Sequence, residues 1–101
     1  MTHWFHPEAL AEYRDAALRY KSVKPELGRD FCNTVEKAIA AILENPARFG
    51  PVQQGVRRCL LKRFPYKLYF LHDEVRRQIV IYAVMHVSRE PDYWKGRLQT
   101  V

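Results

Sequence analysis

Hydrophobic residues in the first half of the chain recur every three or four positions, which is the spacing of a helix with one buried face. This period predicts one helix over Pro7–Lys21 and a second over Pro25–Leu43. Each predicted helix begins with a Pro-Glu pair. This pair is typical of a helix start, because proline is tolerated in the first turn and glutamate favours the positive end of a helix. Asn45-Pro46 ends the second helix, since the residue before a proline disfavours helical geometry. The short break between the helices indicates an antiparallel hairpin.

After a loop from Pro46 to Gly55, the hydrophobic period becomes that of strands. The segment from residue 78 to 86 is apolar on both faces, so it is expected inside the sheet with both sides covered. A final helical turn over Pro91–Trp94 is expected to pack aromatic rings onto the domain. Strands are predicted over Thr2–His6, Val56–Arg63, Tyr66–His72 and Gln78–His86.

These elements predict an α+β fold in the order β-α-α-β-β-β. Consecutive strands with short turns favour an antiparallel sheet, and the helix hairpin is expected to cover one face of it. The pattern leaves the pairing of the first strand open. The residues expected in the core are Phe31, Val35, Ile42, Leu68, Ile81 and Ala83.

Length and composition are those of one small domain over residues 1–101. Of these residues 48% are hydrophobic, which is enough for a core and argues against disorder. The first residues do not have the pattern of a signal peptide and no apolar run is long enough to span a bilayer, so we expect a cytoplasmic protein. Cys32 and Cys59 fit neither a disulfide nor a metal motif, and no cofactor is expected.

The chain carries a net charge of +6, which favours an anionic partner such as nucleic acid or an acidic protein segment. A simpler interpretation is a solvated strand face. Period-two alternation places Arg58 and Lys62 on the same face of one predicted strand. The candidate target-binding or nucleic-acid-binding residues are Arg57, Arg58, Lys62 and Lys67.

Five stretches stand out along the predicted elements, and they are His6-Pro7-Glu8-Ala9, Glu44-Asn45-Pro46-Ala47-Arg48-Phe49, Val56-Arg57-Arg58, Arg63-Phe64-Pro65-Tyr66-Lys67-Leu68-Tyr69 and the segment from His86 to Trp94. In this order and on these elements, they resemble the RelE/ParE superfamily of toxins from type II toxin–antitoxin systems. The resemblance implies a toxin associated with growth inhibition and plasmid stabilisation, which forms a hetero-oligomer with a cognate acidic antitoxin.

The superfamily divides in activity, and the resemblance implies different targets for its branches. RelE-like members cut mRNA in the ribosomal A site, whereas ParE-like members bind DNA gyrase and are not nucleases. Arg63-Phe64-Pro65-Tyr66 and the ending from Arg89 to Trp94 look more like the ParE-like branch. A non-toxic homologue that still binds antitoxin is a third possibility, and whether the chain is an enzyme stays open.

If the chain is an endoribonuclease, the resemblance points to His86, Arg89 and Tyr93 as catalytic residues. RNA cleavage needs a proton acceptor, cations beside the phosphate and an acid for the leaving oxygen. Nuclease members concentrate basic residues after the last strand, but here Val87-Ser88-Arg89-Glu90 offers one arginine beside an acid. His86 at a strand end is also typical of a structural histidine.

Overall fold

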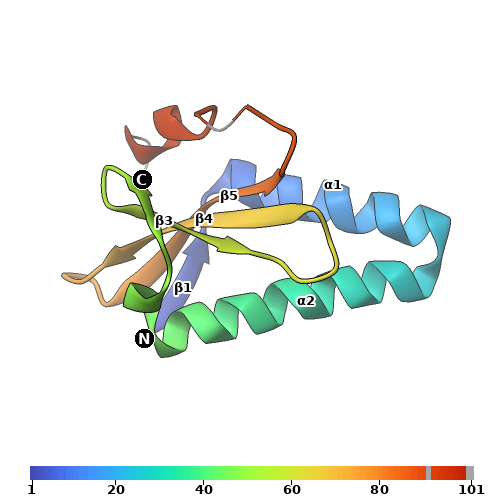
Figure 1. Cartoon of the computed structure of the whole chain (residues 1–101), viewed down its shortest axis with the longest axis horizontal. Coiled ribbons are helices and arrows are strands. Elements are labelled where there is room, and N and C mark those ends of the chain that lie inside the picture. Colours follow the sequence, from blue (N-terminus) through green and yellow to red (C-terminus); the bar gives the residue numbers. More distant parts are fainter. Residues whose placement is uncertain (91, 100–101) are drawn as a thin grey trace.

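A helix hairpin lies against one face of a five-stranded sheet, and the C-terminal segment lies on the other side (Figure 1). The computed structural model describes residues 1–90 and 92–99. No helix within those residues is long and apolar enough to cross a membrane. The elements are β1 (Thr2–Phe5), α1 (Pro7–Val23), α2 (Pro25–Glu44), the 3-10 helix η1 (Pro46–Arg48), β2 (Pro51–Gln53), β3 (Val56–Leu60), β4 (Tyr66–Asp73), β5 (Gln78–His86) and the 3-10 helix η2 (Lys95–Gln99).

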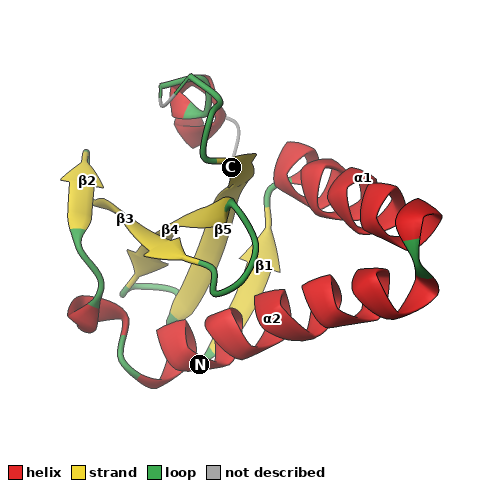
Figure 2. Ribbon diagram, turned by 45° about the vertical axis from the view of Figure 1, so that its right-hand side comes forward, coloured by secondary structure: helices red, strands yellow, loops and turns green. Residues whose placement is uncertain are grey.

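The sheet is mixed, with strand order β1-β5-β4-β3-β2 (Figure 2). Neighbouring strands from β2 to β5 are antiparallel, as predicted. β1 instead runs parallel to β5, so the expected wholly antiparallel sheet is wrong at this edge. The α+β class and the helix hairpin on one face are confirmed. Parallel partners need a long connection, and here the whole helical hairpin and three strands lie between β1 and β5.

The segment predicted as a loop from Pro46 to Gly55 contains an additional strand. β2 pairs with the start of β3 through a two-residue turn in which Gln54 and Gly55 have φ of 55° and 80°. Positive φ at both turn positions is the signature of a tight hairpin with a primed turn. β3 ends at Leu60 rather than at Arg63, since the chain bends at Arg63, whose φ is 72°.

Each face of the sheet buries its own hydrophobic cluster. Toward the helices, Phe31, Val35 and Ile42 of α2 meet Leu68 and Ile81. On the outer face, Ala83 belongs to a second cluster that is closed by the fully buried Trp94. All six predicted core residues are buried, so this prediction is confirmed.

The helix hairpin follows the predicted bounds within two residues and is tightly packed. The first helix is capped by His6, whose Nδ1 accepts a hydrogen bond from the Glu8 amide at 3.1 Å. The second helix, α2, packs closely against α1 at Gly28, where an added Cβ would lie 2.9 Å from the Cβ of Lys21. Of the predicted final turn, Pro91 lies outside the described residues, and residues 92–94 form a turn before η2.

Candidate functional sites

An ion pair caps the part of β5 that has no strand beside it. β1 pairs with β5 only as far as Ile81. Beyond that point the Val84 amide donates to Glu12 of α1 at 3.0 Å, and Arg97 donates to the Tyr82 carbonyl at 2.8 Å. Arg97 and Glu12 also bind each other through contacts of 2.9 and 2.8 Å. The pair therefore satisfies backbone groups that a neighbouring strand would otherwise bind.

Arg97 is held at this position by burial and charge. Its guanidinium is almost fully buried and also lies 3.6 Å from a carboxylate oxygen of Glu8. Burial alone would lower the pKa of Arg97, but the hydrogen bonds and charge of Glu12 outweigh it and raise the pKa above its ordinary value. A buried cation with this many partners fastens the C-terminal segment to α1.

Arg89 and Tyr93, two of the candidate catalytic residues, are part of the same cluster. The Arg89 guanidinium pairs with Glu12 at 3.1 Å and lies 3.6 Å from the centre of the Tyr93 ring. The Tyr93 hydroxyl is buried, and no hydrogen bond to it is found among the described residues. Burial, followed by the nearby Glu12 carboxylate, raises the pKa of Tyr93. The charge of Arg89 is thus already partnered, and Tyr93 keeps its proton at neutral pH.

His86, the third candidate, lies at the end of β5 with one ring nitrogen already engaged. Its Nδ1 accepts from the Ser88 amide at 3.1 Å and lies 2.8 Å from the Ser88 hydroxyl, and its ring meets the edge of Tyr66. His86 and Arg89 line one cleft, which Tyr93 does not reach. Glu12 and Asp15 line the same cleft together with Arg19, so the cations of the cleft lie beside carboxylates rather than facing an open phosphate site.

The four basic candidate residues do not form one surface. Arg57 faces the helix layer and donates to the Phe49 carbonyl at 2.6 Å, whereas Arg58 pairs with Tyr69 on the outer face. Lys67 is also on the outer face, with its ammonium 5.7 Å from the Tyr69 ring. The prediction that Arg58 and Lys62 share a strand face is wrong, because β3 ends at Leu60 and Lys62 lies in the following segment.

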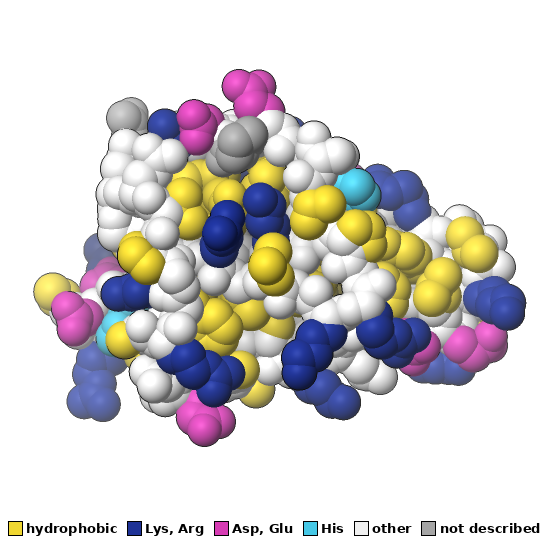
Figure 3. Space-filling model, in the orientation of Figure 1, with side chains coloured by type: hydrophobic (Ala, Val, Ile, Leu, Met, Phe, Trp, Pro, Cys, Tyr) yellow, Lys and Arg dark blue, Asp and Glu magenta, His cyan; other side chains and the backbone are white. Residues whose placement is uncertain are grey.

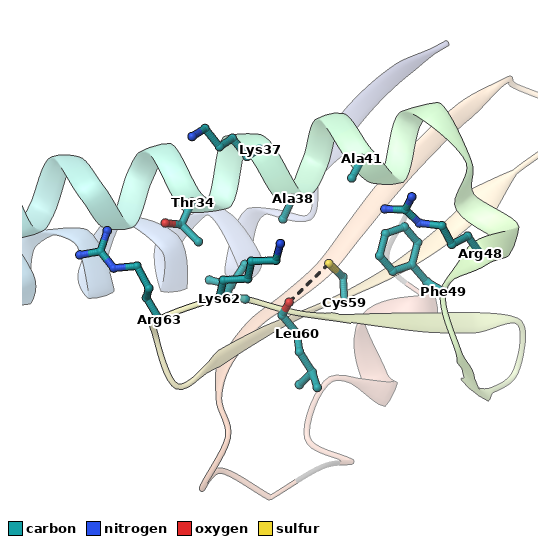
Figure 4. Close-up of a pocket in the computed structure, with 11 residues that line it drawn as sticks. Thr34, Lys37, Ala38, Ala41, Arg48, Phe49, Cys59, Leu60, Lys62 and Arg63 are labelled. Carbon is teal, nitrogen blue, oxygen red and sulfur yellow. Dashed lines mark hydrogen bonds between the residues drawn. The ribbon is translucent and has the colours of Figure 1, made fainter.

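A groove of about 400 Å³ separates α2 from β3, and Lys62 belongs to it (Figure 4). Four cations line it, and no acidic side chain is among the described lining residues. Three of these cations, Lys37, Arg48 and Arg63, are not among the binding residues predicted from the sequence. The signal that marks the groove is a row of small residues, Thr34, Ala38 and Ala41, at helical spacing on α2. The four cations are Lys37, Arg48, Lys62 and Arg63.

The basic side chains are spread widely over this side of the molecule. In Figure 3 they lie along the front of α2 and over β3 and β4, with hydrophobic side chains visible between them. Among residues 1–90 and 92–99, no cluster of three or more His, Cys, Asp or Glu side chains is placed to hold a metal ion. The chemistry available at the groove is therefore the binding of an anionic, partly apolar partner.

Comparison with known proteins gives a family and several similar solved structures. Residues 4–91 match the family described as the ParE toxin of the type II toxin–antitoxin system parDE. The chromosomal ParDE toxin–antitoxin system from P. aeruginosa gives a TM-score of 0.71 at 17% identity, covering 85% of this chain and 95% of that one. The isolated E. coli RelE toxin gives a TM-score of 0.66 at 16% identity, covering 99% of this chain and 98% of that one. No curated protein matches. At these identities the two structures show a shared fold.

Proposed function

The chain belongs to the ParE toxin family of type II toxin–antitoxin systems, and on this premise we propose that it acts in the cytoplasm by binding DNA gyrase. The observation that carries the proposal is the state of Arg89 and Tyr93. Arg89 is held by Glu12 and lies over the Tyr93 ring, and the Tyr93 hydroxyl is buried, so neither is free to act on an RNA phosphate. The proposed activity is inhibition of growth through binding, without chemistry by the toxin itself.

RNA cleavage would need cations directed at the phosphate and a group that exchanges a proton near neutral pH. The cleft beside His86 holds two carboxylates that match its two arginines, and the Tyr93 pKa is raised away from neutrality. These features favour the gyrase proposal over ribosome-dependent endoribonuclease activity. The nuclease alternative depends on His86, whose second ring nitrogen has no hydrogen bond to a described residue.

We further propose that an antitoxin neutralises the chain by forming a hetero-oligomer with it. The net charge of +6 favours an acidic segment, because opposite charges speed encounter and suppress wrong pairing. Exposed ion pairs contribute little free energy, so apolar side chains of the antitoxin should supply most of the affinity.

Two assays run side by side test the choice of target. The purified chain is added to a DNA gyrase supercoiling reaction and to a translation reaction in which mRNA ends are mapped. We expect loss of supercoiling and intact mRNA. Cleaved mRNA with unaffected gyrase would overturn the proposal in favour of the nuclease, and no effect in either assay would identify a non-toxic homologue that binds antitoxin.

His86→Ala separates the same alternatives within one molecule. If the chain works by binding gyrase, the variant should inhibit supercoiling as well as the unaltered chain does. If His86 were a general acid or base, its loss should lower RNA cleavage by about a hundredfold or more. A thermal unfolding curve for the variant serves as the control for folding.

A further inference from the structure

One outer edge of the sheet, that of β1, has no strand beside it among the described residues (Figure 2). The His6 amide donates to the Ile81 carbonyl at 2.9 Å, so strand alternation turns the backbone groups of Trp4 toward β5 as well. The backbone N–H and C=O groups of His3 and Phe5 therefore face away from the sheet. These four groups are placed to pair with an added strand.

β1 has none of the features that usually protect an exposed strand edge. Its sequence, Thr-His-Trp-Phe, contains no lysine, arginine, acid or proline, and its pairing with β5 is regular throughout. Trp4 leaves 41% of its surface exposed. Natural edge strands are normally protected by charges, prolines or bulges, and tryptophan is enriched where proteins meet. A regular, uncharged edge with an exposed tryptophan therefore marks an association surface.

The opposite edge of the sheet, at β2, is protected in the usual way. β2 has only three residues, and its pairing with β3 is irregular between Pro51 and Gln53. Its first residue, Pro51, has no N–H to offer to another strand. Sheet extension therefore fits the edge of β1 and not the edge of β2.

The geometry of β1 fits a second copy of the same strand. Two copies related by a two-fold axis pair antiparallel, and the register that uses both outward-facing residues of each β1 places His3 opposite Phe5 of the second copy. Trp4 then lies opposite Trp4 of the second copy at the axis, in the non-hydrogen-bonded position where side chains approach most closely. Phe5 stacks on Tyr13 of α1, so alternation places both indole rings on the face away from the helices, where they can cover each other.

The distribution of charge favours a copy of this strand over an anionic partner. The net charge of +6 attracts an acidic segment to places where cations are exposed, and β1 carries no lysine or arginine. Two copies of the chain repel each other as whole molecules, but this edge brings two uncharged strands together. Added salt should therefore strengthen the association of two copies, whereas it weakens the binding of an acidic partner.

We propose that the chain forms a homodimer in which β1 pairs antiparallel with β1 of a second copy, so that two sheets become one continuous sheet. The contact lies at the opposite edge of the sheet from β2 and depends on neither gyrase nor an antitoxin. Because the paired segment is short, the dimer is weak, with a dissociation constant on the order of 100 µM.

Sedimentation equilibrium of the purified chain between about 10 µM and 1 mM tests the dimer. We expect the average mass to rise from that of a monomer toward that of a dimer. Trp4→Thr should weaken the dimer about tenfold or more, and Val23→Thr, at an exposed position at the far end of α1, should change it less than about twofold. A monomer at every concentration, or equal effects of the two variants, would overturn the proposal.

Disulfide cross-linking tests the register. Trp4→Cys places one thiol of each copy at the two-fold axis, where a Cα separation of about 4.5 Å suits a disulfide. Thr2→Cys is the matched control, because it lies on the same strand face but away from the axis. In oxidised glutathione we expect a covalent dimer of Trp4→Cys, with Thr2→Cys no different from the unaltered chain. Equal cross-linking of the two variants, or none of Trp4→Cys, would contradict the pairing.

Hydrogen exchange distinguishes a second copy from another occupant of the edge. The His3 and Phe5 amides should exchange about threefold or more slowly at 1 mM than at 10 µM, as expected for new hydrogen bonds between strands. The Trp4 amide faces β5 and should not change, so it is the internal control. Protection of His3 and Phe5 that appears only when an antitoxin is added would assign the edge to the antitoxin and overturn the homodimer.

Discussion

Two inner strands of the sheet lack a neighbour over part of their length, and the molecule treats them differently. Beside Tyr82 and Val84 on β5, the Glu12–Arg97 pair binds the free backbone groups. Beside Leu60 on β3, no described strand takes that role, and the groove there is lined by four cations, of which only Arg63 pairs with a carboxylate among the described residues. Exposed strand edges invite pairing with another chain, so proteins usually cover or charge them. The capped edge is closed by side chains of the chain itself, and the edge at Leu60 is covered by no described strand.

The same contrast separates the basic residues into two groups. Arg89 and Arg97 share the Glu12 carboxylate and hold the C-terminal segment on the sheet. Lys37 and Lys62 have no described acidic partner. Arg89 and Arg97 should therefore contribute to the free energy of unfolding, whereas Lys37 and Lys62 should contribute to the rate of association with the antitoxin. Each prediction below tests one side of that division.

Removal of Arg97 should have the largest effect on stability. Arg97→Ala removes the donor to the Tyr82 carbonyl and two of the hydrogen bonds to Glu12, and loss of one partner of a buried ion pair typically costs about 3 kcal/mol or more. The free energy of unfolding from denaturant titration measures this loss. Arg97→Lys, which keeps the charge but not the forked geometry, should fall between Arg97→Ala and the unaltered chain. A loss below about 1 kcal/mol in Arg97→Ala would break the distinction between the two edges.

The free energy of unfolding should also depend on pH through His6, whose pKa is affected by Arg97 of the capped edge. Burial, and then the positive charge of Arg97, lower the pKa of His6 below its usual 6.5. Below pH 6.5 the unfolded chain therefore binds more protons than the folded chain. The contribution of neutral His6 to the free energy of unfolding is fully present above pH 6.5, and it is lost as the pH falls through the pKa of His6 in the folded protein. Since neutral His6 also caps α1, we expect a loss of about 1 kcal/mol.

His6→Asn provides the matched control for that pH dependence. Asparagine keeps a cap acceptor but does not titrate, so the variant should show a flatter stability profile between pH 7 and pH 5. Denaturant midpoints at each pH measure it. An unchanged slope in His6→Asn would show that another group is responsible.

Tyr93→Phe should have a small effect in the opposite direction. The buried hydroxyl has no hydrogen bond among the described residues, so its removal should leave stability unchanged or raise it by up to about 1 kcal/mol. The melting temperature and the supercoiling assay together test the variant, and gyrase inhibition should persist. A severe loss of toxic activity in a stable protein would assign Tyr93 a direct role and weaken the view of this cluster as structural.

Lys62→Ala should have the smallest effect on stability. The side chain is exposed and has no described acidic partner, so the free energy of unfolding should change by less than about 0.5 kcal/mol. The same variant should slow association with the antitoxin. A stability loss as large as that of Arg97→Ala would remove the contrast between the capped edge and the edge at Leu60.

The sequence determined the parts of the fold that depend on neighbouring residues. The helix bounds follow from the repeat of apolar positions and from Pro7, Pro25 and Pro46, and the structure confirms the hairpin within two residues. The predicted core is confirmed for the same reason, because a helix face or a strand face is fixed by local spacing. The hairpin turn at Gln54 and Gly55 was also local, and its glycine was a signal that the predicted loop contained a strand.

The tertiary structure decided which strands pair and what each charge does. β1 pairs with β5 across the whole chain, and no local pattern encodes that contact. The candidate catalytic residues lie close together in sequence, but Arg89 and its neighbour Arg97 are held by Glu12, which is 77 residues from Arg89 and 85 from Arg97. Whether an arginine is neutralised or free depends on the charges that folding brings within a few ångströms, because Coulomb interactions are set by distance in space. Sequence alone therefore predicts a basic surface, and only the fold separates its structural arginines from those available to a partner.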